Sequence, residues 1–96
     1  SRGLGDVYKR QHYNLANALG HLGRRKDAIR HYRRAVELKP NDADSRNNLG
    51  VMLMQDGLMK EAAQQFIEVL RIRPEDRVAA ANLRDAEAGI PRDNSQ

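Results

Sequence analysis

Residues 14–40 read NLANALGHLGRRKDAIRHYRRAVELKP, and residues 48–74 read NLGVMLMQDGLMKEAAQQFIEVLRIRP. The two stretches align without a gap when the sequence is shifted by 34 residues. The identical pairs include Asn14/Asn48, Leu15/Leu49, Leu19/Leu53, Gly23/Gly57, Lys26/Lys60, Ala28/Ala62 and Pro40/Pro74. Self-similarity at such a period indicates a repeat protein that is built from one supersecondary unit.

Each unit is predicted to form two helices. Before each glycine, apolar residues recur at steps of three and four residues, which is the spacing of one helix face. In the first unit these residues are Leu15, Ala18, Leu19 and Leu22. A second apolar run extends from about Arg25 to Leu38 and stops at Pro40, because proline cannot continue the helical hydrogen-bond ladder. Asn41 and Asp42 then offer side-chain oxygens that cap the next helix.

A fifth helix is predicted after the second unit. It carries apolar residues at Ala79, Ala80, Leu83 and Ala86. It ends at Gly89-Ile90-Pro91, where the glycine is expected to act as a C-cap. The predicted organisation is a first unit at 12–42, a second unit at 43–76, a closing helix at 77–89 and a disordered tail at 90–96.

The first eleven residues, SRGLGDVYKRQ, show no apolar periodicity. This segment, 1–11, resembles the translated linker read-through that is found at the ends of metagenome-derived reading frames. The alternative is a flexible N-terminal arm. On the first interpretation the true N-terminus is missing, so the functional argument begins at residue 12.

Composition favours a binding protein over an enzyme. The chain has no cysteine, which is typical of a cytoplasmic protein and excludes thiolate chemistry, and it has no apolar run of about 20 residues that could span a membrane. His12, His21 and His31 are too far apart for two of them to share a helical turn, so we expect solvent or groove positions and no metal. No catalytic constellation or cofactor motif is present in the sequence.

These residues together resemble the tetratricopeptide repeat over about 9–88. The matching positions are Leu15-Ala16, Leu19, Gly23, Ala28, Tyr32, Ala35 and Pro40 in the first unit, with Leu49-Gly50, Leu53, Gly57, Ala62, Phe66, Val69 and Pro74 in the second. The resemblance implies an all-α, right-handed α-solenoid of five helices in helix-turn-helix hairpins. The sequence departs from the family pattern at His12, Arg46, Ala80, Arg84 and Glu87.

The family resemblance also implies a function: a protein-interaction module whose concave groove, lined by the first helix of each unit, holds an extended peptide or a partner helix. The expected groove residues are Tyr13, Asn14, Asn17, His21, Asn47, Asn48, Val51, Gln55, Val78, Ala81, Asn82 and Asp85. Asn14, Asn48 and Asn82 recur at the repeat period, and this row is similar to the asparagine ladder of O-linked N-acetylglucosamine transferases. Alternatively, each amide bonds within the stack.

Three other functions have some support in the sequence. A carboxylate clamp of the kind that grips chaperone C-termini would use Asn17 and Asn48, but its basic places hold Tyr13, Val78 and Asn82. The chain is alternatively the C-terminal arm of a larger, glycosyltransferase-like enzyme that presents substrate, with further repeats or a catalytic domain upstream. A basic cluster gives a third hypothesis, nucleic-acid binding, although a solvated convex face is favoured. The cluster comprises Arg24, Arg25, Lys26, Arg30, Arg33 and Arg34.

Overall fold

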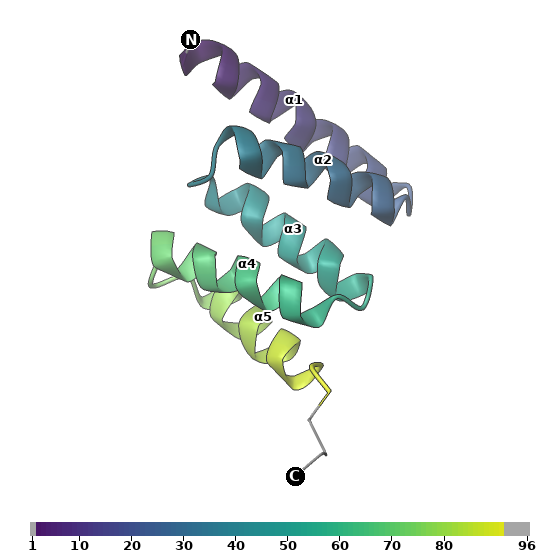
Figure 1. Cartoon of the computed structure of the whole chain (residues 1–96), viewed down its shortest axis with the longest axis vertical. Coiled ribbons are helices and arrows are strands. Elements are labelled where there is room, and N and C mark those ends of the chain that lie inside the picture. The colour runs from purple at the N-terminus through teal and green to yellow at the C-terminus, as the bar shows by residue number, and fades with distance from the viewer. Residues whose placement is uncertain (1, 92–96) are drawn as a thin grey trace.

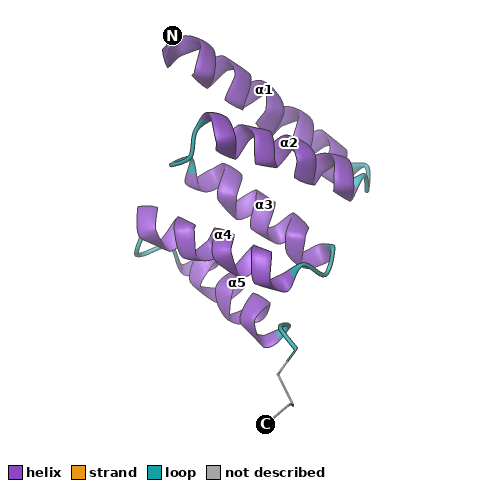
Figure 2. Ribbon diagram, in the orientation of Figure 1, coloured by secondary structure: helices purple, strands orange, loops and turns teal. Residues whose placement is uncertain are grey.

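The computed structural model describes residues 2–91, and these residues form five α-helices and no strand. The helices are α1 (Arg2–His21), α2 (Arg25–Leu38), α3 (Ala43–Gln55), α4 (Met59–Ile72) and α5 (Arg77–Ala88). They follow one another along the long axis of a body that measures 51 × 30 × 22 Å (Figure 1). Short loops join them (Figure 2). This arrangement confirms the predicted all-α stack of helical hairpins.

Small and aromatic residues interlock the two helices of each hairpin. Ala16, Ala28 and Tyr32 are buried in the first hairpin, and Gly50 and Phe66 are buried in the second. A Cβ atom added at Gly50 would lie only 2.6 Å from the Phe66 ring, so this approach of α3 to α4 requires glycine. The small and aromatic residues that recur in the two units are therefore the ones that pack the two helices of each hairpin together.

The predicted helix breaks at two glycines are confirmed. Gly23 has a φ of 78° and Gly57 a φ of 82°, in the left-handed region that side chains with a Cβ atom disfavour. Gly89 is the C-cap of α5, as predicted, but its backbone is right-handed, with a φ of −83°. The polar tail predicted at 90–96 lies, from residue 92 onward, outside the described residues.

Helix α1 begins at Arg2, so residues 2–11 are helical and do not form the flexible arm given as the alternative for this segment. Two ion pairs join its first turns to the loop between α2 and α3. The Lys9 ammonium lies 3.3 Å from the Asp42 carboxylate, and the Lys39 ammonium lies 2.5 Å from that of Asp6. Apolar periodicity does not reveal this extension, because these contacts are polar and distant in sequence. The origin of the segment stays a prediction.

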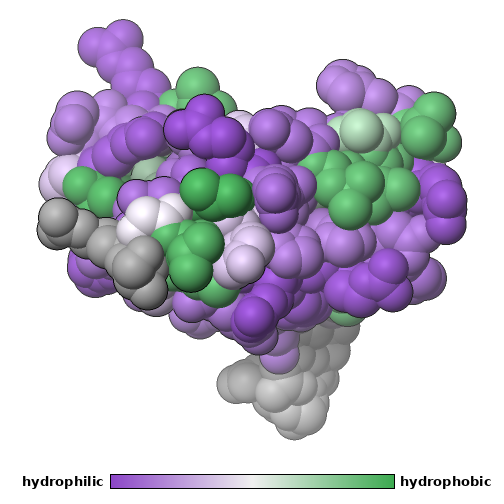
Figure 3. Space-filling model, turned by 90° about the horizontal axis from the view of Figure 1, so that it is seen from above, coloured by the Kyte–Doolittle hydropathy of each residue, from purple (hydrophilic) through white to green (hydrophobic). Residues whose placement is uncertain are grey.

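The outer face of α1 has no helix against it. Leu15 is 45% exposed and Leu22 is 73% exposed, whereas Leu49, which matches Leu15 at the repeat period, is 1% exposed. Leu49 lines the same narrow gap as Val36 of α2 and Gln65 of α4. Viewed from the α1 end, apolar side chains gather in patches on a largely hydrophilic surface (Figure 3). None of the described helices is long and apolar enough to cross a membrane.

Candidate functional site

A hollow of about 360 Å³ opens between α1 and α3, and the buried ring of Tyr32 forms part of its wall. We call it the α1–α3 hollow. Five of its lining residues were predicted as groove residues: Asn17, His21, Asn48, Val51 and Gln55. The other three, Gly20, Tyr32 and Met52, were not among the predicted groove residues.

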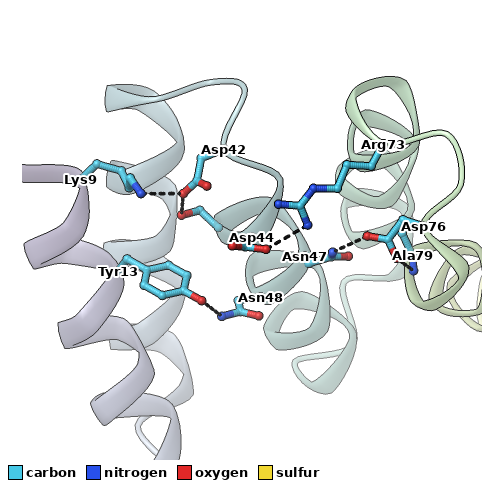
Figure 4. Close-up of polar contacts among 10 residues, drawn as sticks. Lys9, Tyr13, Asp42, Asp44, Asn47, Asn48, Arg73, Asp76 and Ala79 are labelled. Carbon is cyan, nitrogen blue, oxygen red and sulfur yellow. Dashed lines mark hydrogen bonds and ion pairs between the residues drawn. The ribbon is translucent and has the colours of Figure 1, made fainter. Parts of the chain in front are cut away.

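Four side chains form a hydrogen-bond network at this hollow. The Asn48 Nδ2 group donates to the Tyr13 hydroxyl and to the Asn17 Oδ1 atom, each at 3.2 Å. The Tyr32 hydroxyl also donates to Asn17 Oδ1. The two tyrosine rings meet edge to face at 6.0 Å between centroids. Figure 4 shows the contact between Tyr13 on α1 and Asn48 on α3. The network therefore spans three helices.

The network orients both carboxamides. Asn17 uses its oxygen as an acceptor, and Asn48 uses both N–H bonds of its amide nitrogen as donors. The Asn17 Nδ2 donor and the Asn48 Oδ1 acceptor have no hydrogen-bond partner among residues 2–91. One donor and one acceptor, from two side chains that line the hollow, thus remain unused within the described residues. A peptide unit, with one carbonyl and one N–H, is chemically complementary to this pair.

The Tyr32 hydroxyl keeps its proton at neutral pH. Burial raises the pKa of Tyr32 above its usual value, and a smaller effect from the nearby Asn48 amide opposes this shift. A neutral phenol donates a hydrogen bond, whereas a phenolate could not. The orientation of the Asn17 amide is therefore maintained across the physiological pH range.

The three asparagines of the predicted row have different environments in the structure. Asn14 is exposed on α1 and does not line the α1–α3 hollow. Asn48 bonds within the stack, which is the alternative considered for the row, while its oxygen stays available. Asn82 is half-buried on α5. The amides that come together are Asn17 and Asn48, which are 31 residues apart, about one helical turn less than the repeat period of 34 residues.

The remaining predicted groove residues lie outside this hollow. The Asn47 Nδ2 group donates to Asp76 Oδ2 at 3.3 Å, and Asp76 Oδ1 accepts a bond from the Ala79 backbone N–H at 3.0 Å (Figure 4). Asn47 therefore links α3 to the start of α5. Val78 and Asp85 are exposed on α5, and Ala81 is half-buried there.

Each of the six basic residues in the predicted cluster has an acidic partner. Asp56 lies 3.3 Å from both Arg25 and Lys26, and Glu61 binds Arg33, so these pairs join the first unit to the second. Lys26, followed by Arg25, holds the pKa of Asp56 below its usual range. The other three pairs lie within α2 or at its start: Arg24–Asp27, Arg30–Asp27 and Arg34–Glu37. Part of the basic cluster is therefore paired with acidic residues of the second unit.

Two histidines that are distant in sequence meet across the first hairpin. The Nδ1 atoms of His12 on α1 and His31 on α2 lie 2.9 Å apart. Sequence spacing along one helix could not reveal this pair. The available signal was that His12 and His31 lie on either side of the Gly23 turn, because an antiparallel hairpin brings positions before and after its turn together. Within residues 2–91 no group of three or more potential ligands could hold a metal ion.

Comparison with known proteins identifies the repeat. A family model described as tetratricopeptide repeat matches residues 13–77. Human Protein O-mannosyl-transferase TMTC1 is 54% identical over 41 residues, which are 43% of this chain and 5% of that protein. The Peroxisomal targeting signal receptor of Eremothecium gossypii is 36% identical over 67 residues, 70% of this chain and 12% of the receptor. The Saccharomyces cerevisiae receptor is 41% identical over 56 residues, 58% of this chain and 9% of the receptor. The chain thus spans only a small part of these relatives.

Proposed function

The chain belongs to the tetratricopeptide-repeat family, a family of protein-interaction modules, and we propose that its α1–α3 hollow holds an extended segment of a partner protein. The observation that carries this proposal is the amide pair, in which Asn17 offers a donor and Asn48 offers an acceptor. A peptide carbonyl would accept from Asn17 Nδ2, and a peptide N–H would donate to Asn48 Oδ1. Main-chain recognition of this kind reads the backbone of the partner.

An extended segment suits this pair better than a partner helix does. In a helix the backbone carbonyl and N–H groups already bond to each other, so they have little need of the amides. An extended chain has free backbone groups on both sides. Val51 and Met52 add apolar surface beside the amides, which would accept a partner side chain.

The lining also favours an internal segment over a free C-terminus. None of the eight residues that line the α1–α3 hollow is lysine or arginine. Without a cation, a carboxylate would lose its hydration and gain no charge-assisted bond. The absence of lysine and arginine from this lining therefore opposes a carboxylate clamp. The yeast relatives are named as receptors for a targeting signal, which agrees with a groove that receives a protein segment.

The alternative is that these residues form the arm of a larger enzyme. It draws on the match to Protein O-mannosyl-transferase TMTC1, which covers 5% of that protein. On our proposal the segment itself binds and does not catalyse, and any catalysis belongs to another part of a longer protein. Recovery of the full reading frame tests this alternative, because a catalytic domain in the same chain would support the enzyme arm.

The amide pair is tested with a pool of eight-residue peptides that are N-acetylated and C-amidated. We expect Asn17→Ala and Asn48→Ala each to weaken binding about two- to tenfold, the usual value of a hydrogen bond between neutral groups. Asn14→Ala, at an exposed position outside the hollow, is the matched control and should bind as the unchanged chain does. Far-UV circular dichroism checks that each variant keeps its helices.

Two outcomes would contradict the proposal. Equal binding by the Asn17 and Asn48 variants and the control would show that the amide pair does not recognise the peptide. Tighter binding of the same peptides with free C-terminal carboxylates would favour a clamp over main-chain recognition.

A further inference from the structure

The bond between His12 and His31 lies along the line that joins the two rings. The ring centroids are 5.2 Å apart and the Nδ1 atoms are 2.9 Å apart, a difference of about one imidazole width. The two nitrogens therefore lie between the rings, and the ring planes differ by only 23°. This is the geometry of an in-plane N–H···N hydrogen bond. One ring must donate its Nδ1 proton and the other must accept it.

This bond determines what the two outer nitrogens can do. In the neutral pair, the ring that donates has a free Nε2 lone pair, and the ring that accepts carries an Nε2–H group. No residue within 2–91 forms a hydrogen bond with either Nε2 atom. One added proton converts the free lone pair into a second N–H donor and makes the bond between the rings charge-assisted. A second added proton breaks that bond, because both rings would then be donors.

The histidine pair opens on a hollow of about 400 Å³ on the surface of the first hairpin, which we call the histidine–arginine hollow. Its other lining residues are Arg30, Arg33, Arg34 and Glu37. The lining of this hollow thus contains three guanidinium groups and one carboxylate. Each has an acidic partner, but a guanidinium carries five N–H donors and one carboxylate engages two at most. Donors and positive charge remain available, and they oppose the binding of a metal cation.

We propose that the histidine–arginine hollow binds a tetrahedral oxyanion of the phosphoryl class and takes up one proton on the His12–His31 pair as it does so. The protonated pair offers two outward N–H donors, and Arg30 and Arg34 offer planar forks that match phosphoryl oxygens. This site is separate from the α1–α3 hollow, because the two share no lining residue. It does not depend on the proposed peptide function.

The charges around the histidine pair determine how the affinity for the anion changes with pH. The groups that face it are Arg30, Arg33, Arg34 and Glu37, with Asp27 and Glu61 as ion-pair partners. Burial, followed by His12 and Arg30, lowers the pKa of His31, and Asp27 opposes this shift. A bound dianion would favour the protonated form. By linkage, the affinity for the anion must then rise as the pH falls.

The test uses sulfate, because it is a tetrahedral dianion whose own charge does not change near neutral pH. The full chain is titrated with sulfate at about pH 5.5 and about pH 8 at constant ionic strength, and imidazole signals are followed by NMR. We expect binding about fivefold tighter at the lower pH, the lower end of typical coupling between linked sites. The His12 and His31 signals should shift, and the His21 signal serves as the internal reference.

Variants separate the site from general attraction. Arg34→Gln should weaken sulfate binding several-fold, whereas Arg84→Gln, at an exposed position on α5, is the control of equal charge. Glu37→Gln should strengthen binding, and His31→Gln should abolish its pH dependence. Circular dichroism monitors folding, and the Glu37 variant keeps both histidines should the His31 variant unfold.

Three results would overturn the proposal. They are no saturable sulfate binding at either pH, equal effects of the Arg34 and Arg84 variants, or a pH dependence that persists in the Glu37 variant without any shift of the His12 and His31 signals. Inorganic phosphate and O-phosphoserine then distinguish the source of the phosphoryl group. Tighter binding of O-phosphoserine indicates a phosphorylated side chain, and tighter binding of inorganic phosphate indicates the free ion.

Discussion

Gly50 is where one missing methyl group determines how closely two helices approach. Its counterpart in the first unit, Ala16, has a Cβ atom and is also buried. The ring of Phe66 fills the space at Gly50, and Phe66 is fully buried. The first hairpin therefore accommodates a Cβ atom at this position, whereas the second hairpin does not.

We predict that Gly50→Ala lowers the free energy of unfolding by about 1–3 kcal/mol, because the enclosed Phe66 ring must move. Gly20→Ala is the matched control. A Cβ atom there would lie 3.6 Å from the Met52 sulfur, an ordinary contact, and alanine favours a helix interior by up to about 1 kcal/mol. Urea unfolding measures both. Similar effects of the two substitutions would contradict the packing argument.

His31 gives the stability a dependence on mildly acidic pH. Its pKa in the folded chain is lowered, so the unfolded chain binds the proton more readily than the folded chain does. The contribution of His31 is present above about pH 6.5, the ordinary histidine pKa, and is lost as the pH falls through the folded value. We expect thermal midpoints in sulfate- and phosphate-free buffer to fall from pH 7 to pH 5. His31→Gln should flatten this decline.

Among whole helices, α1 differs from α3 in having one uncovered side. We predict that Leu49→Ala costs about 2–5 kcal/mol, the usual cost of deleting a buried leucine side chain. Leu15→Ala, at the matching position 34 residues earlier, should cost less than about 1 kcal/mol, because the side chain is half exposed. Chemical denaturation compares the two. A large cost at Leu15 would mean that another surface covers α1 in solution.

Helix α5 has the only N-cap side chain in residues 2–91 that bonds to its own helix backbone. Asp76→Ala should lower the free energy of unfolding by about 1 kcal/mol, the typical value of a cap. Asp76→Asn is the control, since asparagine caps equally well. The Ala79 N–H bond, above all, lowers the pKa of Asp76, so the stabilisation is present above its unfolded pKa and is lost as the pH falls.

The helices themselves were largely predictable from sequence, because glycine and proline act through local backbone geometry. Gly23, Gly57, Pro40 and Pro74 mark the ends that the structure has. The expected capping of α3 by Asp42 is wrong in detail. That carboxylate accepts a bond from the Ser45 hydroxyl at 2.5 Å and makes no cap bond to the backbone.

The candidate site was predictable only in part. Periodicity places Asn17 and Asn48 on the inner helices, but it does not predict which of their amide groups form hydrogen bonds within the stack. That information depends on Tyr13 and Tyr32, whose hydroxyl groups reach the amides only after the hairpins pack. The His12–His31 pair depends in the same way on the rotation of α2 against α1. Contacts between two helices cannot be predicted from the residue pattern of one helix alone.

The molecule as a whole is a short stack with exposed ends. About three repeats are usually needed for independent stability, and two hairpins with one further helix fall below that number. We predict that residues 12–96 alone have a thermal midpoint below about 65 °C, the upper range of mesophilic domains. Hydrogen exchange should be slowest in α2, α3 and α4, each of which packs against a helix on either side. A higher midpoint or uniform protection would contradict this prediction.

The ion pairs between hairpins have a consequence for the order of the units. Arg25 and Lys26 find Asp56 in the following hairpin, whereas the equivalent of Asp56 in the first hairpin is Leu22. If the two hairpins were exchanged, Met59 and Lys60 would face a leucine, and these attractions would vanish. The hairpins are alike in backbone but not interchangeable. Shuffling or recombination of such units would therefore be selected by their surface charges as well as by their shape.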